Sequence, residues 1–548
     1  MKAIDSVSCV SGHQYDSALS LGARHSQARE YEQALQYFSE AKTLQPYSGA
    51  AWAGCGDVFA ARSEFSTASA FYEQALKLDT HNAEIHLKLG SVYAELAMIG
   101  TASVHLIRSL ELNPRQSRCW AVLVQIHSEG ASSKETVRKI QSMVSGNVDR
   151  WIMLSGIGRG LLMLGRYADA RELLALSLRN VPENTESLLH LAEVEMCLGN
   201  MDQSRQLYER AVAQAPNSYL TFICYLEHLI RTSDIDEAKS AYRRRLRSSA
   251  GFRKEPLAKE RVSYPEWSGQ APSGKTILFR NDGGHGGTLQ YVRFARQMRE
   301  QGATIVVECR RPLLRLLSTL DGAESIVEKQ DDYPQIDYCA RPGMAALLLD
   351  WSWATLGAHI PYVHPPGDLI SRWDQRLGNH NSLRVGLNWY GEQLWRRDEN
   401  RYRSIPLREF GTMAMTPGVR LYSLQFGVGA EQTASAGFEI EHLKVGDLLD
   451  TGAAIAALDV VVTIDTVVAH LAGALGKPCF LLLPYIACWR WMLGRTDSPF
   501  YPSMRLFRQT KGGNWSGPIA AACRELAVLA QTHCLIRQQS EPGINQPV

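Results

Sequence analysis

The sequence has 548 residues, of which 45% are hydrophobic and 21% are charged, an ordinary composition for a folded, water-soluble protein. At roughly 150 residues per domain, this length predicts several folded units rather than one core. The 58 Lys and Arg residues nearly balance the 56 Asp and Glu residues. The net charge of +2 therefore excludes a nucleic-acid binder that relies on a generally basic chain, and any anion site must be local.

Apolar stretches such as residues 460–464 are far shorter than the roughly 20 residues of a membrane span, and the first residues lack the apolar core of a secretory signal. We therefore expect a cytoplasmic protein without a membrane span. The 11 cysteines stand singly, with no CxxC pair. This pattern argues against metal centres, disulfide frameworks and thiol redox chemistry.

Residues 15–250 repeat with a period of 34. One column holds small residues, with a single valine: Gly22, Gly56, Gly90, Val124, Gly158 and Ala192. Another column holds bulky apolar residues: Phe38, Tyr72, Leu106, Ile140, Leu174, Tyr208 and Tyr242. Each unit is predicted to be a pair of antiparallel helices, in which the small residue admits the bulky one. About seven stacked units would bury a common core and form a groove.

One unit carries Trp52, Gly56, Phe59, Ala68, Tyr72 and Ala75. At this spacing the segment resembles the tetratricopeptide repeat (TPR). Grooves of such arrays bind peptides or another copy of the protein. The sequence leaves open whether the repeats recruit a protein or peptide partner, or act as a scaffold or in a homo-oligomer.

The C-terminal half alternates strands and helices, which predicts parallel sheets built from βαβ units. The expected strands are TILFRN, TIVVEC, SIVEK, QIDYCA, RVGLNWYG, RLYSLQF, VVVTID and CFLLLP. The predicted segments are a solenoid at 1–250, a linker at 251–274, a first α/β half at 275–366, a hinge at 367–382, a second half at 383–534 and a tail at 535–548. Two doubly wound halves would share a cleft at the ends of their strands.

One motif in the second half predicts an anion site. The strand at 460–464 ends at Asp465, Thr466 follows, and the small residues of 467–475 predict a helix packed on a sheet. Free N–H groups at that helix N-terminus suit a diphosphate, which Thr466 and His470 could also contact. The alternative is structural, with a capped helix and a core histidine.

An arginine-rich loop follows Asn388 and runs to Ser404. It carries Arg396, Arg397, Arg401 and Arg403. Guanidinium groups bind phosphate oxygens bidentately, so this loop could complete an anion clamp, although a solvated loop is an equal alternative.

A glycine-rich loop within residues 279–298 is expected at the same cleft. Its glycines are Gly283, Gly284, Gly286 and Gly287. They allow the backbone to approach a ligand closely. The loop matches neither the dinucleotide pattern GxGxxG nor the P-loop, so neither familiar mode of nucleotide binding is supported.

Residues 386–509, with NWYG, RSIPL, DTVVAHLAGALGKP and WRWMLGRTDSPFYPS, resemble the glycosyltransferase family 9 group that contains the heptosyltransferases. They are more distantly similar to the O-linked N-acetylglucosamine transferases, which join TPR repeats to a GT-B fold. The resemblance implies a TPR α-solenoid followed by a GT-B pair of doubly wound α/β halves. It also implies a nucleotide-diphosphate sugar as substrate, with no metal or other cofactor. The residues that match the donor-binding motifs are Arg403, Ser404, Asp465, Thr466, His470, Trp489 and Arg490.

The chain departs from this family at the glycine-rich loop. Family members typically carry EQGLGDTLQF where this chain reads DGGHGGTLQY, so Gly287 replaces the carboxylate implied as the general base. His285 and Asp282 are the remaining candidate bases. Cys488 also stands where aspartate is usual. The sequence therefore predicts a glycosyltransferase with an acceptor, such as a protein, recruited by the repeats. The alternative is a non-catalytic scaffold with a degenerate transferase domain.

Overall fold

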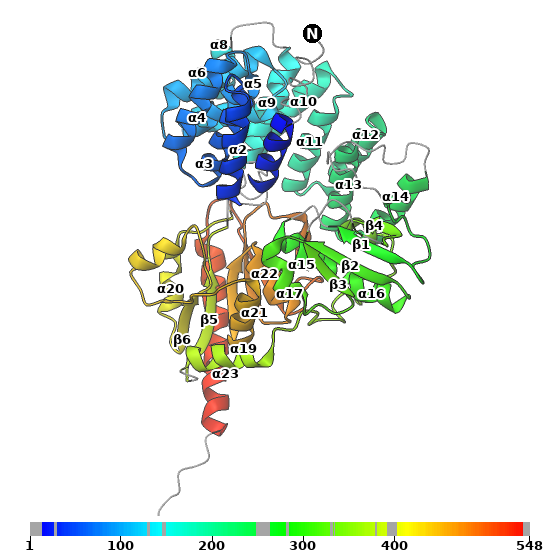
Figure 1. The fold of residues 1–548 in the computed structure, drawn as a ribbon. Helices are drawn as coiled ribbons and strands as arrows, with labels where there is room; N and C mark the ends of the chain where they lie inside the picture. Colours follow the sequence, from blue (N-terminus) through cyan, green and yellow to red (C-terminus); the bar gives the residue numbers. More distant parts are fainter. Residues whose placement is uncertain are drawn as a thin grey trace, which may run out of the picture. The chain divides into compact units, whose positions relative to one another are not determined.

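The computed structural model describes residues 14–26, 30–128, 132–144, 149–247, 264–280, 284–328, 333, 335–378, 381–391 and 403–540. The chain divides into two compact units, Met1–Tyr225 and Leu226–Val548. The first unit is helical, and the second contains two parallel sheets (Figure 1).

Paired helices build the first unit. The first helices of the pairs are α3 (Gly49–Ala61), α5 (Ala83–Glu95), α7 (Ser117–His127), α9 (Arg150–Met163) and α11 (Thr185–Cys197). The second helices are α2 (Tyr31–Leu44), α4 (Phe65–Leu78), α6 (Ile99–Leu112), α8 (Ser133–Met143), α10 (Tyr167–Asn180) and α12 (Met201–Gln214). These second helices begin 34 residues apart, which confirms the repeat found in the sequence.

Close approach between the helices of a pair explains the two residue columns. A Cβ atom added to Gly56 would lie 2.6 Å from the Tyr72 ring, and one added to Gly158 would lie 2.7 Å from Leu174. Both distances are shorter than real contacts allow, so a larger residue would force the helices apart. The small residue and its partner 16 positions later therefore form the repeated core contact.

A left-handed backbone turn follows the first helix of several pairs. The residues there have φ values of 61° at Ser63, 59° at Ala97, 73° at Gly165, 86° at Gly199 and 68° at Ser233. This conformation ends a helix and favours glycine, because other residues place Cβ too close to the backbone. The repeat thus keeps its turn geometry even where its glycine is replaced.

The last helix pair lies in the chain between the helical repeats and the α/β region. It comprises α13 (Tyr219–Arg231) and α14 (Ile235–Arg247), and the boundary between the compact units lies inside α13. The Arg231 carbonyl accepts a hydrogen bond from the Leu493 amide at 3.1 Å, and the Ser233 carbonyl accepts one from Trp353 Nε1 at 3.1 Å. The Lys239 ammonium group lies 4.4 Å from the centre of the Trp351 ring. By sequence this pair is a repeat, but by packing it belongs to the second unit.

The strands described in the second unit pair with one another in parallel. A four-stranded sheet has the order β3-β2-β1-β4, and a six-stranded sheet has the order β10-β9-β8-β5-β6-β7. The first sheet contains β1 (Thr276–Arg280), β2 (Thr304–Cys309), β3 (Ser325–Glu328) and β4 (Tyr338–Ala340). The second contains β5 (Leu383–Asn388), β6 (Val419–Ser423), β7 (Glu441–His442), β8 (Val460–Ile464), β9 (Cys479–Leu483) and β10 (Met504–Arg508). The expected strands and their parallel arrangement are confirmed.

Helices connect and cover these strands. They are α15 (His285–Val292), α16 (Phe294–Glu300), α17 (Leu314–Leu317), α18 (Pro342–Ala346), α19 (Gly367–Leu377), α20 (Gly411–Ala414), α21 (Leu448–Ala457), α22 (Val467–Ala474) and α23 (Ser516–Ser540). Short 3-10 turns include the one at Trp489–Trp491. Helix α15 follows the first strand of one sheet, α22 follows β8 of the other, and the two helices pack together (Figure 1).

Three segments differ from the sequence expectation. The expected hinge at 367–382 contains helix α19, because Trp373 and Leu377 lie one turn apart and are both buried. Part of the expected linker joins the first sheet, since the Trp267 amide donates to the Cys339 carbonyl at 2.8 Å. The expected tail at 535–548 is helical as far as Ser540, with its first proline at Pro542.

Helix α23 is the one described helix that is long and apolar enough to cross a membrane, and 22% of that apolar window is buried. Its first half contributes Ile519, Ala522 and Leu526 to the core beneath the six-stranded sheet. A single such helix is weak evidence for a membrane segment, and the absence of a membrane span stays a prediction.

Candidate functional site

Polar side chains meet where three neighbouring strands of the six-stranded sheet end. Asn388 ends β5, Gln425 follows β6, and Thr466 follows β8. The Thr466 hydroxyl donates to Asn388 Oδ1 at 2.7 Å, and Asn388 Nδ2 donates to Gln425 Oε1 at 2.7 Å. The carboxyl ends of parallel strands are where ligands bind in open α/β sheets. Thr466 is the N-cap residue of α22, but its hydroxyl makes no cap hydrogen bond to that helix. The hydroxyl belongs instead to the row of polar side chains formed with Asn388 and Gln425.

His470 lies one turn inside α22 and is only 4% exposed. Its Nδ1 atom is 2.9 Å from the Tyr501 hydroxyl, and its Nε2 atom is 3.8 Å from Asp465 Oδ1. The pKa of His470 is lowered to about 3, mainly by burial; Asp465 opposes this shift, and three arginines contribute to it. His470 is therefore a neutral ring near neutral pH.

Arg403 reaches the same strand end from the loop after β5. It donates to the Asp465 carbonyl through Nη1 at 2.6 Å, and it packs against Gly391, where an added Cβ would lie 2.5 Å from Arg403 Nε. The Ser404 hydroxyl donates to the Gly391 carbonyl at 3.0 Å and accepts from the Gly391 amide at 3.1 Å. Ser404 thus holds the loop base, which positions Arg403. Arg396, Arg397 and Arg401 lie outside the described residues.

Arg490 approaches from the turn at Trp489–Trp491. Its Nη1 atom donates to Cys488 Sγ at 2.9 Å, and its guanidinium group lies 4.6 Å from the Trp489 ring centre. Burial opposes its charge, but Cys488, Tyr291 and Asp465 outweigh burial and raise its pKa. A Cβ atom added to Gly287 would be 3.6 Å from Arg490 Nη2, so Arg490 faces the glycine-rich segment.

The glycine-rich segment forms the start of α15. His285 is the first residue of the helix and Gly284 is its N-cap, whereas Asp282 and Gly283 lie outside the described residues. A Cβ atom added to Gly286 would lie 2.4 Å from His470 Cδ2. Glycine is therefore required where α15 meets α22. Figure 1 shows these two helices side by side.

Arg293 was not among the residues predicted for the site, and it lies at the junction of α15 and α16. Its guanidinium group donates to the Phe500 carbonyl at 2.6 Å and to the Tyr362 hydroxyl at 3.1 Å. The positive charges of Arg293, Arg403 and Arg490 each lower the pKa of His470, whereas the carboxylate of Asp465 raises it. The described part of this cluster therefore carries an excess of positive charge.

Gln290 was not among the residues predicted for the site, and it is only 1% exposed. Neither Nε2 nor Oε1 of its side-chain amide has a hydrogen-bond partner among the described residues. Gln290 lies four residues after Gly286 in α15, and therefore on the helix face that meets α22. An orphaned buried amide is costly and needs an explanation, which a bound ligand or water at this face would supply. Gln290 matches the TLQ shared by this chain and the family pattern EQGLGDTLQF, and that match was the available signal in the sequence.

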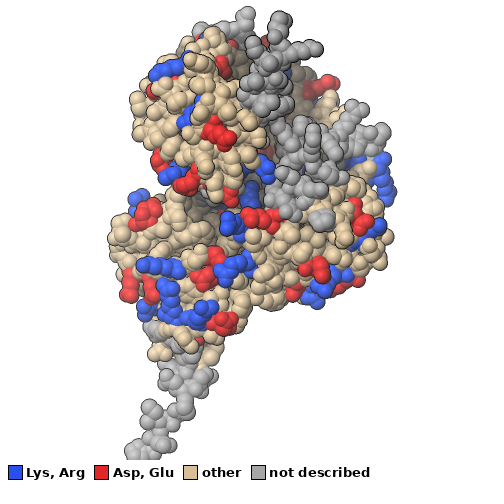
Figure 2. Space-filling view, in the orientation of Figure 1, with Lys and Arg blue, Asp and Glu red and all other residues tan. Residues whose placement is uncertain are grey.

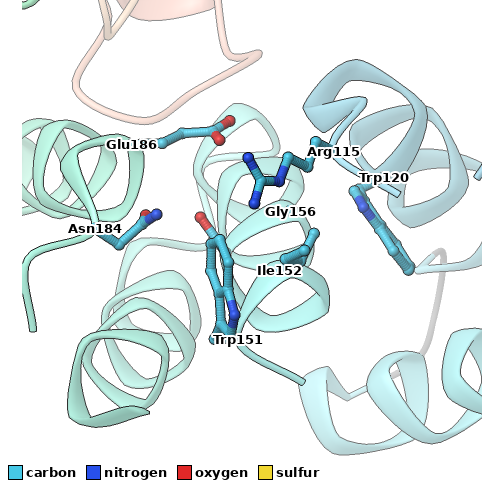
Figure 3. A pocket seen from close by; sticks show the side chains of 8 residues that line it. Arg115, Trp120, Trp151, Ile152, Gly156, Asn184 and Glu186 are labelled. Atoms are coloured by element: carbon cyan, nitrogen blue, oxygen red, sulfur yellow. The ribbon is translucent and has the colours of Figure 1, made fainter. Parts of the chain in front are cut away.

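The first unit contains a separate small pocket of about 110 Å³. It is lined by Arg115, Trp120, Trp151, Ile152, Ser155, Gly156, Asn184 and Glu186. In Figure 3, Arg115 and Glu186 turn their charged ends toward each other across the pocket, and the rings of Trp120 and Trp151 lie on either side of Ile152 and Gly156. These residues come from three successive units, as the groove of a repeat array requires.

On the face of the molecule in Figure 2, Lys and Arg side chains are interspersed with Asp and Glu. That mixture agrees with the nearly balanced charge of the chain. The excess of positive charge around His470 is therefore a local feature.

Two family descriptions match the first unit: "TPR repeat" over residues 56–96 and "Tetratricopeptide repeat" over residues 161–221. The N-terminal region is thus a TPR-like helical solenoid, as its period predicted.

Among curated proteins, the chain is similar to protein FlbA of Caulobacter vibrioides, with 23% identity over 431 residues, which are 72% of this chain and 70% of that protein.

Solved structures also resemble parts of the chain. The yeast Tom70 structure shares 18% identity with a TM-score of 0.29, covering 39% of this chain and 45% of that one. The Pseudomonas aeruginosa pilF structure shares 21% identity with a TM-score of 0.25, covering 40% of this chain and 97% of that one. TM-scores this low add no argument about fold or function.

Proposed function

We propose that the second unit is a GT-B glycosyltransferase domain that uses a nucleotide-diphosphate sugar, and that the repeats recruit its acceptor. The observation that carries this proposal is the excess of positive charge around His470, which is exposed to the charges of Arg293, Arg403 and Arg490 and to the single carboxylate of Asp465. A diphosphate is the anion that such a cluster complements. The resemblance of residues 386–509 to glycosyltransferase family 9 supports the same ligand.

In the proposed reaction, the acceptor hydroxyl oxygen attacks the anomeric carbon of the sugar. The bond from that carbon to the diphosphate oxygen breaks, and the configuration at the carbon inverts. The acceptor proton passes to His285 or Asp282, and the nucleoside diphosphate leaves with the bonding electron pair.

This chain's own residues would stabilise the departing charge. The backbone N–H groups at the start of α22 and the guanidinium groups of Arg403 and Arg490 provide fixed positive charge without reorganisation. The side-chain amide of Gln290, on the face of α15, would form a hydrogen bond with the bound ligand, which would give this buried amide a partner.

The repeat pocket is the proposed contact for the acceptor or partner. Arg115 lies 6.0 Å from the centre of the Trp151 ring, and Figure 3 shows its charged end turned toward Glu186 across the pocket. A peptide side chain could enter between the two tryptophans while its flanking charges meet these two residues. We expect the double variant Arg115→Ala, Glu186→Ala to lose partner binding without losing nucleotide binding.

The direct test is the thermal stability of the full chain with UDP, ADP, GDP, CDP and their sugars. A ligand at 100 times its Kd that binds only the folded state adds about 2.7 kcal/mol of stability. We expect one nucleotide class to raise the melting temperature, and Arg490→Met to abolish that rise. Arg505→Met is the matched control, because Arg505 is 61% exposed and pairs with Glu525. A chain that no nucleotide stabilises would contradict the proposal.

The second candidate function is a non-catalytic scaffold in which the repeats bind a partner and the α/β unit is catalytically silent. The observations that favour it are Gly287, which leaves α15 without the family carboxylate, and the low pKa of buried His470, about 3, which makes that histidine a poor base. Hydrolysis of a sugar donor that His285→Gln or Asp282→Asn abolishes would reject this alternative. Nucleotide binding without any turnover would favour it.

A further inference from the structure

A buried tyrosine contacts the central histidine of the candidate site. Tyr501 is fully buried, and its hydroxyl lies 2.9 Å from His470 Nδ1. Neutral imidazole donates from one nitrogen and accepts at the other, so the contact made at Nδ1 decides what Nε2 can do. Tyr501 lies in the motif WRWMLGRTDSPFYPS, but the motif gave it no role.

The surroundings of Tyr501 hold its ring and orient its hydroxyl. The Arg293 guanidinium lies between two aromatic rings, 4.6 Å from the centre of Tyr501 and 4.8 Å from that of Tyr362. Arg293 is itself fixed by the backbone carbonyls of Phe500, at 2.6 Å, and of Gln290, at 2.8 Å. Burial raises the pKa of Tyr501 well above its ordinary value and outweighs the opposing effect of Arg293, so the hydroxyl keeps its proton and can donate it in a hydrogen bond to His470.

The opposite edge of His470 faces an anion. Nε2 lies 3.8 Å from Asp465 Oδ1, which is beyond hydrogen-bond distance but close enough for the carboxylate to favour a proton on that nitrogen. A Cβ atom added to Gly286 would lie 3.0 Å from Nε2, so this edge looks toward the N-terminus of α15. Both neighbours therefore favour the same arrangement, with Nδ1 accepting and Nε2 protonated.

We propose that Tyr501 is a positioning residue that holds His470 in the tautomer with its proton on Nε2, so that the ring donates from Nε2 to the diphosphate of the bound ligand. The role of His470 toward a diphosphate rests on the proposed function. The tautomer rests on Tyr501 and Asp465 alone.

The tautomer is measured on the full chain labelled with 15N-histidine, with the His470 signals identified by their loss in His470→Gln. We expect a protonated Nε2 and an unprotonated Nδ1 in the wild type. In Tyr501→Phe, which keeps the ring but removes the hydroxyl, we expect both tautomers to be populated. A wild type protonated on Nδ1, or a Tyr501→Phe variant with unchanged signals, would overturn the proposal.

The binding measurement uses inorganic pyrophosphate as the diphosphate probe, by calorimetry. Losing the fixed donor should weaken binding about fivefold in Tyr501→Phe, the equivalent of one net hydrogen bond. Adding Tyr501→Phe to His470→Gln should change nothing further, because the tyrosine acts through the histidine. Independent, additive losses would overturn the positioning role.

Tyr422→Phe is the matched control. Tyr422 is also fully buried in the second unit, and its hydroxyl donates to the Leu377 carbonyl at 2.9 Å, away from His470. We expect it to leave both the histidine signals and pyrophosphate binding unchanged. If the wild type bound neither pyrophosphate nor any nucleoside diphosphate, the proposed function would fail, whereas the nitrogen signals would still decide the tautomer.

Discussion

The two regions of this molecule acquire their structure from contacts of very different range. In the solenoid, the central contact joins a small residue to one only 16 positions later, as between Gly56 and Tyr72. In the second unit, the contact between Gly286 and His470 joins residues far apart in the chain. Local contacts leave a periodic trace in the sequence, and distant ones do not. The repeats are therefore visible from their spacing, whereas the site needs the fold to bring it together.

The largest effect on stability is expected from a substitution that removes the local contact between Gly56 and Tyr72. Tyr72 is 2% exposed and donates a hydrogen bond to Asp57 at 2.7 Å. Tyr72→Ala should destabilise the solenoid by about 3–5 kcal/mol, because it leaves a cavity between two helices. Urea denaturation followed by circular dichroism would measure the loss. Tyr47→Ala is the control, since Tyr47 is 88% exposed, and it should change stability by less than about 0.5 kcal/mol.

The distant contact is tested at Gly286. Gly286→Ala should cost about 1–3 kcal/mol, because the new methyl group would lie 2.4 Å from His470 Cδ2 and push α15 away from α22. Thermal denaturation would report this cost. Gly284→Ala offers a close comparison, since nothing lies within 4 Å of its added Cβ. Equal effects of the two substitutions would contradict the close approach of the helices.

His470 should make the stability of the second unit depend on pH. Burial lowers its folded pKa to about 3, below the ordinary value of 6.5, so the unfolded chain binds more protons in that window. Stability must therefore fall as the pH drops from 6.5 toward 3, with a loss from this group of about 2 kcal/mol at pH 5. Chemical denaturation at several pH values would show a shallower slope for His470→Gln. An unchanged slope would mean that the ring is protonated in the folded state.

The smallest expected effect concerns the left-handed turns of the solenoid. Ala97 has a φ of 59°, where glycine has no steric penalty. Ala97→Gly should stabilise the chain by about 0.5–1 kcal/mol, whereas Gly199→Ala at the equivalent position should destabilise it by a similar amount. Melting temperatures measured side by side would test both signs. A loss of stability on Ala97→Gly would show that the backbone strain at this turn is smaller than the conformational entropy that glycine loses on folding.

Much of the fold could be predicted from the sequence, because helix pairs and buried strands follow from local patterns. Asp465, Thr466, His470 and Arg490 carried motifs, and the structure brings them together. The motifs did not assign Arg293, Gln290 or Tyr501 to the site. The contacts of Arg293 and Tyr501 join residues distant in the chain, and the orphaned amide of Gln290 is visible only in the folded structure. Ser404 was expected at the ligand, but its hydroxyl bonds the backbone of Gly391. The motif thus indicated the correct loop, but it did not reveal that Ser404 stabilises the base of that loop.

The last helix pair of the solenoid has a consequence for how the chain can change in length. Helices α13 and α14 contact the second unit through Arg231, Ser233 and Lys239. This helix pair therefore connects the repeats to the α/β region. Whole units of 34 residues could be added or removed upstream without disturbing that attachment, since each repeat contacts only its neighbours. The reach of the array and the chemistry of the α/β region can therefore diverge independently among relatives.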